Sequence, residues 1–450
     1  MRPRLTYSAQ AVYDSTDCTR RANRKSTSCA KQTRAAKRNS LLTTRYHGRI
    51  LAVYALVLLG AGSGAAGVRD EDYAARFDQI WRTTQQRFYD RNMAGLDWQA
   101  VADQYRPKAR SAVSRPEFEA VVNRMLGELH ASHTGYYTDD DMEFYLLKSL
   151  FQNDFDQTRM THIGVMGVRK DGAFIVKAML DGGSASQGGI RYGDRILDVE
   201  GRPFTTVGAF RNREGMPVKL SIDRPGTGRL TIAVTPVREN PQRAFLEATE
   251  KSVRIIEHGG KRFGYVHLWA MTNDRFRQAL DGALTGALAK TDGLVLDLRD
   301  GFGGHPFGFT DVLFRPDIAW TQTPRNGPST TSRIGYGKPI VVVVNEGTRS
   351  AKESFAYQMK KTRRGPLVGT TTAGAFLGAG GFPIGSDGYL ELPVVDLALD
   401  GKRLEGVGVP PDITVEASDS YGPNDRQLAR ALEVLEERVR QPAAVAADRP

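Results

Sequence analysis

The chain has 450 residues, enough for two or three domains, and a formal net charge of +11 that by itself would suggest an anionic partner. Residues 1–67, however, hold 12 of the 62 Lys and Arg residues and only two of the 51 acidic ones, Asp14 and Asp17. The rest of the chain therefore carries 50 basic and 49 acidic side chains, and this balance gives no support to a nucleic-acid-binding function.

The first 67 residues divide into a basic extension and a targeting segment. Residues 1–44 are basic, rich in Ser and Thr and without periodicity, which indicates disorder or a start site assigned too far upstream. Residues 45–67 have the layout of a secretory signal peptide, with Arg49 before the apolar run 50–59 and small residues at 61–67. The run is short for a membrane span, so we expect cleavage and export to the periplasm or outside the cell, with an uncleaved membrane anchor as the alternative.

Cysteine and histidine usage limits the chemistry. Both cysteines, Cys18 and Cys29, lie in the basic extension, so a chain that begins near Val68 contains none. This excludes thiol catalysis, disulfides and cysteine-ligated metals in the mature protein. His130 and His133 are three residues apart, but no third ligand follows at a diagnostic spacing. We expect neither a metal nor a cofactor.

Residues 68–155 are predicted to form a helical region. Between Asp70 and Leu129 apolar residues recur at i, i+3 and i+4, the spacing of amphipathic helices that pack on another surface. The region ends in Leu129-His-Ala-Ser-His-Thr-Gly135, which supplies Ser132 and His133.

Residues 156–240 change to short predicted strands separated by glycine turns, with strands expected at 162–168, 173–180 and 218–224. Ile163-Gly164-Val165, together with Gly188-Gly-Ile-Arg-Tyr-Gly-Asp-Arg-Ile-Leu197, resembles a PDZ domain of the protease-associated type. The resemblance implies that Ile163, Gly164 and Val165 bind the terminal carboxylate of a peptide beside an open strand edge. A β-rich spacer without a ligand is the alternative.

Residues 241–420 alternate between predicted strands and helices, which indicates a parallel-leaning α/β core. Residues 421–450 close the chain with an amphipathic helix over 424–439 and a tail. In the core we expect strands at 262–270, 293–299, 339–344 and 366–369, helices at 274–290 and near 307–313, and extended chain at 389–399.

Ser350 stands where the buried strand 339–344 is predicted to turn into a helix. Unpaired N–H groups and the helix dipole favour developing negative charge at such a junction, which suits a nucleophilic serine. A helix N-cap serine without chemistry occupies the same position. Glu353 and Ser354 of the same helix are interpreted as structural, and Asp297 with Arg299 as stabilising the end of a strand.

Five segments follow one another in a defined order. The histidine segment 129–135 precedes the PDZ-like insert, which is followed by the glycine-rich segment 297–304, by Thr348-Arg-Ser-Ala-Lys-Glu353 and by Glu405-Gly-Val-Gly-Val-Pro-Pro-Asp-Ile413. This order is similar to the serine proteases of the tail-specific and tricorn superfamily, peptidase family S41, over about residues 70–415. The resemblance implies an α/β fold with a crotonase/ClpP-like protease core, an N-terminal helical region and an inserted PDZ domain.

The family contains two catalytic designs, and the residues here match one of them. The carboxyl-terminal processing branch pairs its serine with a downstream lysine, a position occupied here by Ala375. The tricorn branch uses a histidine instead, which implies Ser350 as nucleophile and His133 as general base. In that pattern Ser132 orients the imidazole and Glu405 completes the relay.

The acyl intermediate of such an enzyme requires fixed hydrogen-bond donors for its oxyanion. Candidates are the N–H groups of Gly303 or Gly304, because glycine permits close approach, and of Ala351. A plain Gly-Gly turn is the alternative for the first pair, and His130 is the competing base. Lys352, where relatives carry a small residue, has two expected outcomes: it hinders substrate or it points to solvent.

These expectations describe an exported serine endopeptidase that recognises polypeptide C-termini and cleaves through an acyl-enzyme, without metal or nucleotide. The alternative is a non-catalytic peptide- or small-ligand-binding protein on the same scaffold. The presence of Ser350, His133 and Glu405 together favours the enzyme, because a copy that had lost activity is expected to lack at least one of them.

Overall fold

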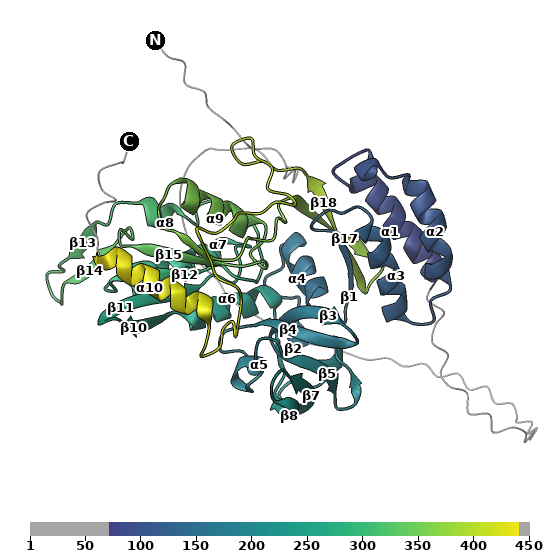
Figure 1. Cartoon of the computed structure of the whole chain (residues 1–450), viewed down its shortest axis with the longest axis horizontal. Coiled ribbons are helices and arrows are strands. Elements are labelled where there is room, and N and C mark those ends of the chain that lie inside the picture. Colours follow the sequence, from purple (N-terminus) through teal and green to yellow (C-terminus); the bar gives the residue numbers. More distant parts are fainter. Residues whose placement is uncertain (1–71, 441–450) are drawn as a thin grey trace, which may run out of the picture. The chain divides into compact units, whose positions relative to one another are not determined.

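The computed structural model describes residues 72–440. The predicted N-terminal helical region begins with three helices (Figure 1). Each helix begins after a residue whose side chain accepts N–H groups of the first turn: Asp72, Asp97 and Ser114. Their apolar sides pack together around the fully buried Phe77. The helices are α1 (Tyr73–Arg87), α2 (Trp98–Arg110) and α3 (Arg115–Gly127), with the 3-10 turn η1 (Met93–Gly95) between the first two.

A small antiparallel sheet joins the histidine segment to the C-terminal part of the chain. Strand β1 (Gly135–Thr138) pairs with β18 (Gly388–Val395), which pairs in turn with β17 (Gly378–Ile384). Side chains alternate between the faces of a strand, and one face buries Tyr136 and Leu390 against the three helices. The sequence of residues 68–155 predicts a helical region alone, so this pairing of the histidine segment is not predicted by it.

Residues 156–240 form a β-rich insert, as predicted. Its strands follow the order β3-β4-β5-β7-β8, with β3 at an edge and β6 paired to β5, while β2 and β9 pair where the chain enters and leaves the insert. The elements are β2 (Met160–His162), β3 (Val165–Lys170), β4 (Ala173–Met179), α5 (Ser184–Gln187), β5 (Arg195–Val199), β6 (Arg202–Pro203), η2 (Gly208–Phe210), β7 (Val218–Arg224), β8 (Gly228–Val234) and β9 (Val237–Glu239).

The central sheet has the strand order β10-β11-β12-β15-β16-β19. Strand β10 is antiparallel at one edge, and the other five run parallel. Strands β12 and β15 are buried along their whole length, as expected for parallel strands between helix layers. The strands are β10 (Arg254–His258), β11 (Lys261–His267), β12 (Gly293–Asp297), β15 (Ile340–Val344), β16 (Leu367–Gly369) and β19 (Ile413–Thr414).

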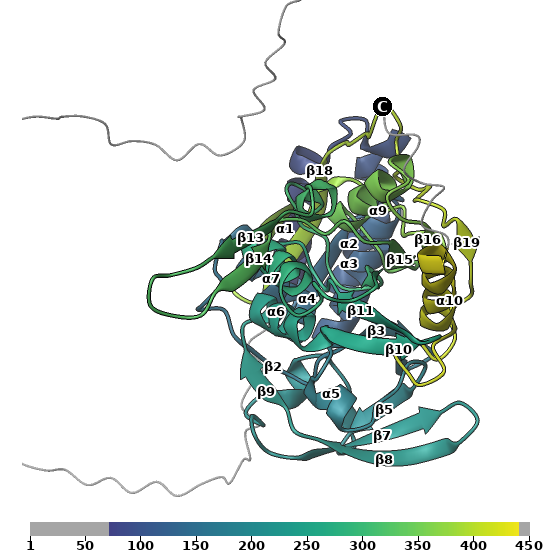
Figure 2. The same ribbon diagram turned by 90° about the vertical axis from the view of Figure 1, so that its left-hand side faces the viewer.

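Helices cover both faces of this sheet, with α10 on one side and α6, α7 and α9 on the other (Figure 2). Alternate residues of β15 separate the two layers: Val342 packs toward α7 and α9, and Val343 toward α10. The C-terminal helix is therefore part of the core. The helices are α4 (Met142–Phe151), α6 (Pro241–Ser252), α7 (Asp274–Thr285), α8 (Asp311–Phe314), α9 (Ala351–Lys361) and α10 (Arg426–Arg440).

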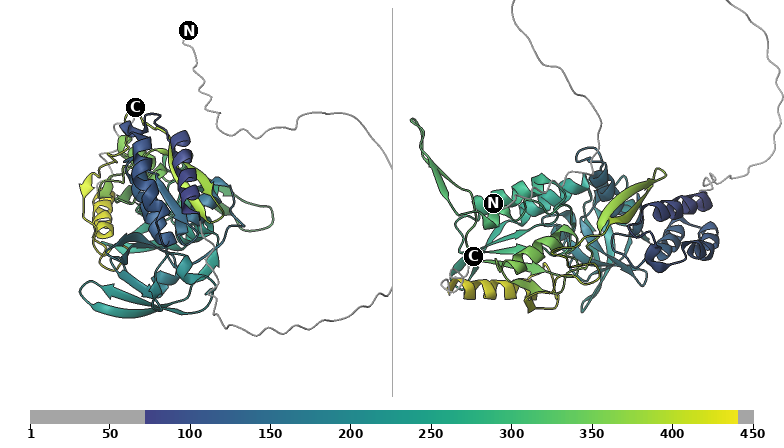
Figure 3. Two further views of the ribbon diagram at one scale, coloured as in Figure 1. Left: turned by 90° about the vertical axis from the view of Figure 1, so that its right-hand side faces the viewer. Right: turned by 90° about the horizontal axis from the view of Figure 1, so that it is seen from above.

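A two-stranded hairpin, β13 (Ala319–Gln322) and β14 (Thr330–Arg333), extends away from the central sheet (Figure 3). Its strands are exposed almost throughout, and they are not among the elements predicted from the sequence. The polar, proline-containing composition of this stretch gives no period-2 pattern, which explains the omission.

Most other predicted elements of the described chain are confirmed, with shifts at their ends. The single strand predicted over 162–168 is wrong, because the chain there is divided between β2 and β3, which belong to different sheets. The helix predicted over 274–290 ends at Thr285, because Gly286 leaves helical geometry, and the helix near 307–313 is a single turn, α8. No helix within residues 72–440 is long and apolar enough to cross a membrane. The predicted signal peptide, 45–67, and the extension before it lie outside the described residues.

We predict that Leu435→Ala lowers the free energy of unfolding by about 2–5 kcal/mol, because Leu435 is fully buried between α10 and the central sheet. Urea unfolding followed by circular dichroism measures the change. The control Glu433→Ala, on the exposed side of α10, should change stability by less than about 0.5 kcal/mol. Equal small effects of both variants would contradict the packing of α10 on the sheet.

Candidate active site

Ser350 occupies the turn between strand β15 and helix α9, as predicted. Its backbone has φ 57° and ψ −127°, a combination that residues other than glycine rarely adopt. The N–H of Ser350 donates to the carbonyl of Ala375 at 3.0 Å and to Oε2 of Glu353 at 3.1 Å. The turn places the serine at the N-terminus of α9, where unpaired N–H groups favour negative charge.

Glu353 fixes the loop that faces the nucleophile. Its buried carboxylate accepts hydrogen bonds from Thr372 Oγ1 at 2.6 Å and from the N–H groups of Gly374 at 2.8 Å and Ala375 at 2.9 Å, in addition to Ser350. The structural role predicted for Glu353 is confirmed, and it extends to the backbone of Ser350 itself. The Ser-x-x-Glu spacing at a helix start is the sequence signal that could have indicated this contact.

Ser132, His133 and Glu405 come together from distant parts of the chain. Ser132 Oγ lies 3.0 Å from Nδ1 of His133 and donates to Oε2 of Glu405 at 2.8 Å. The hydroxyl has one proton, which the carboxylate receives, so Ser132 accepts from His133 and the imidazole proton lies on Nδ1. Nε2 is then unprotonated and able to accept a proton.

Glu405 also connects this group to the nucleophile turn. Its Oε1 accepts the N–H of Ser132 at 2.8 Å and its Oε2 the N–H of Phe376 at 2.7 Å, directly after Ala375, whose carbonyl binds Ser350. Within residues 72–440 the Ser350 hydroxyl makes no hydrogen bond to the imidazole. Catalytic hydrogen bonds are often long without substrate and tighten when it binds.

His133 is buried, whereas His130 is exposed, and it is His133 that contacts Ser132 and, through it, Glu405. Burial, together with the positive charge of Arg349, lowers the pKa of His133 to about 3. The imidazole is therefore neutral at neutral pH, as a general base must be. The described part of the chain contains no group of three or more His, Cys, Asp or Glu side chains arranged to hold a metal ion.

Gly303 adjoins the nucleophile. A Cβ on Gly303 would lie 2.5 Å from the Cβ of Ser350, 2.8 Å from its Oγ and 3.1 Å from the N of Ala351, so only glycine fits there. Gly304 has φ 133° and packs against Met271, whose carbonyl oxygen is 2.2 Å from the position of a Cβ on this glycine. The structure therefore brings Gly303 and Ala351 to the nucleophile and packs Gly304 against the neighbouring backbone.

Both outcomes considered for Lys352 were wrong. Its side chain is fully buried, and Nζ donates to the carbonyl of Asp300 at 2.7 Å, so it neither obstructs substrate nor points to solvent. Burial lowers the pKa of Lys352 to about 7, although the carboxylates of Asp297 and Asp300 act in the opposite direction. The burial of Lys352 could not be predicted, because no local sequence signal indicates that a lysine two residues after Ser350 is buried.

The residues of the PDZ-like loop lie at the entry of the insert. Ile163 and Gly164 precede the edge strand β3, which begins at Val165. Beside them is a cavity of about 20 Å³ that Leu180 and the α6 residue Lys251 also line. This space holds about one water molecule.

A serine, a histidine and a carboxylate are the groups that serine hydrolases use, and here they lie on an α/β scaffold. Residues 262–415 match the model of Peptidase family S41, and residues 69–127 match the model of the Tricorn protease C1 domain. Over residues 262–415 the chain is therefore similar to S41 peptidases.

Curated relatives align over most of this chain. It is 28% identical over 402 residues to tricorn protease homolog 2 of Streptomyces coelicolor, and the aligned residues cover 81% of this chain and 32% of that protein. It is 23% identical over 408 residues to the carboxyl-terminal-processing protease of Synechocystis sp., and the aligned residues cover 86% of this chain and 91% of that protein.

A solved structure shares the fold. The crystal structure of the tricorn protease has a TM-score of 0.50 at 20% identity and covers 82% of this chain and 37% of that one. The chain spans about a third of the length of the tricorn proteins that it matches in sequence.

We predict that Ser350 reacts with a fluorophosphonate at a rate that changes less than about twofold between about pH 7 and pH 5. The general base stays unprotonated across this range, because burial lowers the pKa of His133 to about 3. Arg349→Gln removes a positive charge that lowers the pKa of His133, so labelling should begin to decline at a higher pH than in the wild type. This pH should stay below the pKa of an ordinary histidine, because burial lowers the pKa of His133 more than Arg349 does. A wild-type decline centred near the ordinary value of 6.5 would contradict this.

Proposed function

We propose that the chain is an active serine endopeptidase of the tricorn-like branch, with Ser350 as nucleophile and His133 as general base. Ser132 and Glu405 hold the imidazole in the tautomer that accepts a proton at Nε2. One observation carries the proposal: the path from Nδ1 of His133 through Ser132 Oγ to Glu405, at 3.0 and 2.8 Å. Relatives named as processing proteases support it.

In the proposed reaction Ser350 Oγ attacks the carbonyl carbon of the scissile peptide bond, and Nε2 of His133 accepts the hydroxyl proton. The resulting imidazolium keeps its proton on Nδ1, which donates a hydrogen bond to Ser132 Oγ, and the Ser132 hydroxyl in turn donates to Glu405. Collapse of the tetrahedral intermediate breaks the C–N bond, and His133 returns its proton to the leaving amine. A water molecule then releases the acyl group from Ser350 by the same steps.

The oxyanion of the tetrahedral intermediate requires donors that are fixed before the reaction. We assign this role to the N–H groups of Gly303 and Ala351; Gly304, the other glycine considered, packs against Met271 instead. The close approach of Gly303 to Ser350 supports this assignment.

We further propose that residues 156–240 are a PDZ domain that binds accessible C-termini of polypeptide substrates, and that the central sheet and its helices are a crotonase/ClpP-like core. The edge position of β3 supports peptide pairing, and Ile163, Gly164 and Val165 would hold the terminal carboxylate. Because the cavity beside them measures only about 20 Å³, binding there requires the loop and α6 to separate.

The signal-like composition of residues 45–67 supports a location outside the cytoplasm, in the periplasm or secreted. We propose contact with a membrane only through this segment if it stays uncleaved. The near-neutral charge of residues 68–450 supports polypeptides rather than nucleic acids as partners.

We predict that a fluorophosphonate adds once to the protein from Val68 onward and that the adduct maps to Ser350. Ser350→Ala should abolish labelling, and His133→Ala should slow it at least about a thousandfold, because a serine hydroxyl needs a base to become nucleophilic. Intact-mass spectrometry and peptide mapping measure both.

The matched control is Ser354→Ala, on the same helix, whose hydroxyl donates to the carbonyl of Ala351 at 2.7 Å; it should label at a rate close to that of the wild type. A folded wild-type protein without an adduct would contradict the proposal. It would favour the non-catalytic binding protein instead.

We predict that unstructured polypeptides with a free C-terminal carboxylate have a KM at least about tenfold lower than the same sequences with a C-terminal amide, because charge-assisted hydrogen bonds at the loop contribute about 1.5–3 kcal/mol. Cleavage kinetics on such a pair measure the ratio. Equal KM values would show that the insert does not read the carboxylate, and would leave the catalytic proposal intact.

A further inference from the structure

Lys352 is a buried lysine that the proposed mechanism does not use. It lies in the first turn of α9, two residues after Ser350, and its side chain is 0% exposed. Fully buried lysines are rare, and a cation at a helix N-terminus is also disfavoured by the helix dipole. Two unfavourable terms at one position indicate that a specific contact compensates for them.

The contact is with the start of the oxyanion loop. We use this name for residues Asp300–Gly304, which follow strand β12 and include Gly303, the glycine beside Ser350. Lys352 Nζ donates to the carbonyl of Asp300 at 2.7 Å and lies 3.0 Å from the position of a Cβ on Gly301. The lysine therefore lies directly against the loop, and a Cβ at position 301 would meet both its ammonium group and the carbonyl oxygen of Trp269, at 2.1 Å.

The loop depends on such support because its backbone is unusual. Asp300, Gly301 and Gly304 all have positive φ, at 45°, 72° and 133°. Two backbone hydrogen bonds hold the middle of the loop from the β11 side: the N–H of Phe302 donates to Trp269 at 2.8 Å, and Gly303 accepts from Met271 at 2.8 Å.

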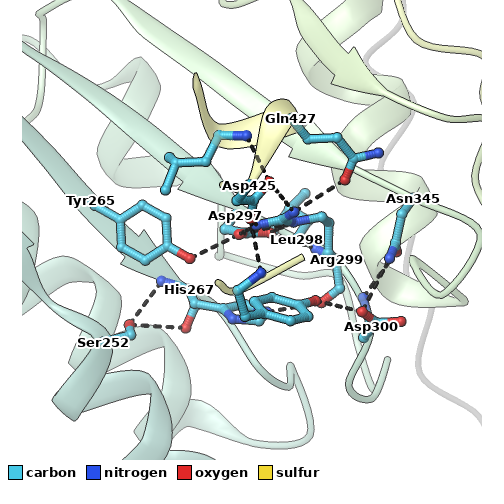
Figure 4. A network of polar contacts seen from close by, with 12 residues as sticks. Ser252, Tyr265, His267, Asp297, Leu298, Arg299, Asp300, Asn345, Asp425 and Gln427 are labelled. Atoms are coloured by element: carbon cyan, nitrogen blue, oxygen red, sulfur yellow. Dashed lines mark hydrogen bonds and ion pairs between the residues drawn. The ribbon is translucent and has the colours of Figure 1, made fainter. Parts of the chain in front are cut away.

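The Asp300 end is held by a polar network (Figure 4). Its N–H donates to Oδ1 of Asn345 at 3.1 Å, its carboxylate accepts from Nδ2 of Asn345 at 3.1 Å, and Tyr421 donates its hydroxyl to the same carboxylate. Arg299, the preceding residue, forms ion pairs with Asp297 at 2.6 Å and with Asp425 at 2.8 Å. The carbonyl of Asp300 is the group left for Lys352.

Lys352 also ties the loop to the helix that carries the nucleophile. Ser350, Ala351 and Lys352 are consecutive at the start of α9, so the Lys352–Asp300 hydrogen bond fixes the loop relative to Ser350. At its far end Gly303 touches the serine, with the position of a Cβ 2.8 Å from Oγ. The donors of the proposed oxyanion hole, Gly303 and Ala351, thus belong to two segments that this one side chain connects.

We propose that Lys352 is a positioning residue that sets the N–H of Gly303 relative to Ser350 and thereby determines the rate of acylation. The proposal rests on the proposed function, because it assigns Lys352 a part in that reaction. A lysine acting as general base would instead need its amine directed at Ser350 Oγ, whereas Nζ is directed at the carbonyl of Asp300.

The test compares Lys352→Met, which keeps the length of the side chain but removes the donor, with Lys361→Met, an exposed lysine of the same helix. We expect Lys352→Met to lower kcat for a peptide substrate about tenfold to hundredfold with KM changed less than about twofold, because a small misplacement at the reacting centre costs about this much. The pH profile should keep its shape. Lys361→Met should resemble the wild type.

Hydrogen–deuterium exchange supplies a readout that does not depend on activity. Peptides covering residues 299–305 should exchange faster in Lys352→Met than in the wild type, and peptides from α10 should not. If the wild type neither labels nor cleaves, the proposed function fails, while this exchange experiment still decides whether Lys352 holds the loop.

Two results would overturn the proposal. One is a folded Lys352→Met variant with wild-type kcat and unchanged exchange at 299–305. The other is a loss of activity with a shifted pH profile and unchanged exchange, which would make Lys352 a proton-transfer residue. If Lys352→Met does not fold, Lys352→Gln replaces it, because its shorter side chain stays polar but does not extend as far as the Asp300 carbonyl. Faster exchange at 299–305 with reduced kcat in this variant supports the proposal, and wild-type exchange with wild-type kcat contradicts it.

Discussion

The candidate active site depends on the parallel pairing of strands β12 and β15, in which Leu294 opposes Ile340 and Asp297 opposes Val343. Parallel strands end at the same edge of a sheet, so the residues that follow them lie together. At this edge β12 continues into the oxyanion loop and β15 into the turn at Ser350. Gly303 and Ser350 are neighbours for this reason, although the chain between them forms a helix turn and the exposed hairpin.

A second constraint brings the histidine to this edge. Strand β1 pairs with β18, and the segment just before β1 is held by Glu405, which binds the backbone and the hydroxyl of Ser132. His133 therefore comes from the N-terminal part of the chain and Glu405 from the C-terminal part. The Glu405 carboxylate also binds the N–H of Phe376, next to Ala375, which accepts the N–H of Ser350, so one glutamate connects the segments that carry His133 and Ser350.

Much of this arrangement could be predicted because its signals are local. The β-branched run 339–344 predicted a buried strand, the composition after it predicted a helix, and the junction at Ser350 followed from the two. The strand pairing of 135–138 with 388–391 could not be predicted, because the pattern of a four-residue strand does not indicate which distant strand it pairs with. The burial of Lys352 was missed for a related reason: a lysine in a helix ordinarily indicates solvent, and only the tertiary contact with Asp300 reverses this.

The central claim is that Ser350 is activated by His133 and faces donors fixed by the oxyanion loop. The crystal structure of the fluorophosphonate adduct tests it most directly. The account predicts a covalent bond from Ser350 Oγ to phosphorus, with the phosphoryl oxygen about 2.7–3.1 Å from the N–H groups of Gly303 and Ala351. Nε2 of His133 should lie within hydrogen-bond reach of Oγ. An adduct at another residue, or a phosphoryl oxygen directed away from both N–H groups, would contradict it.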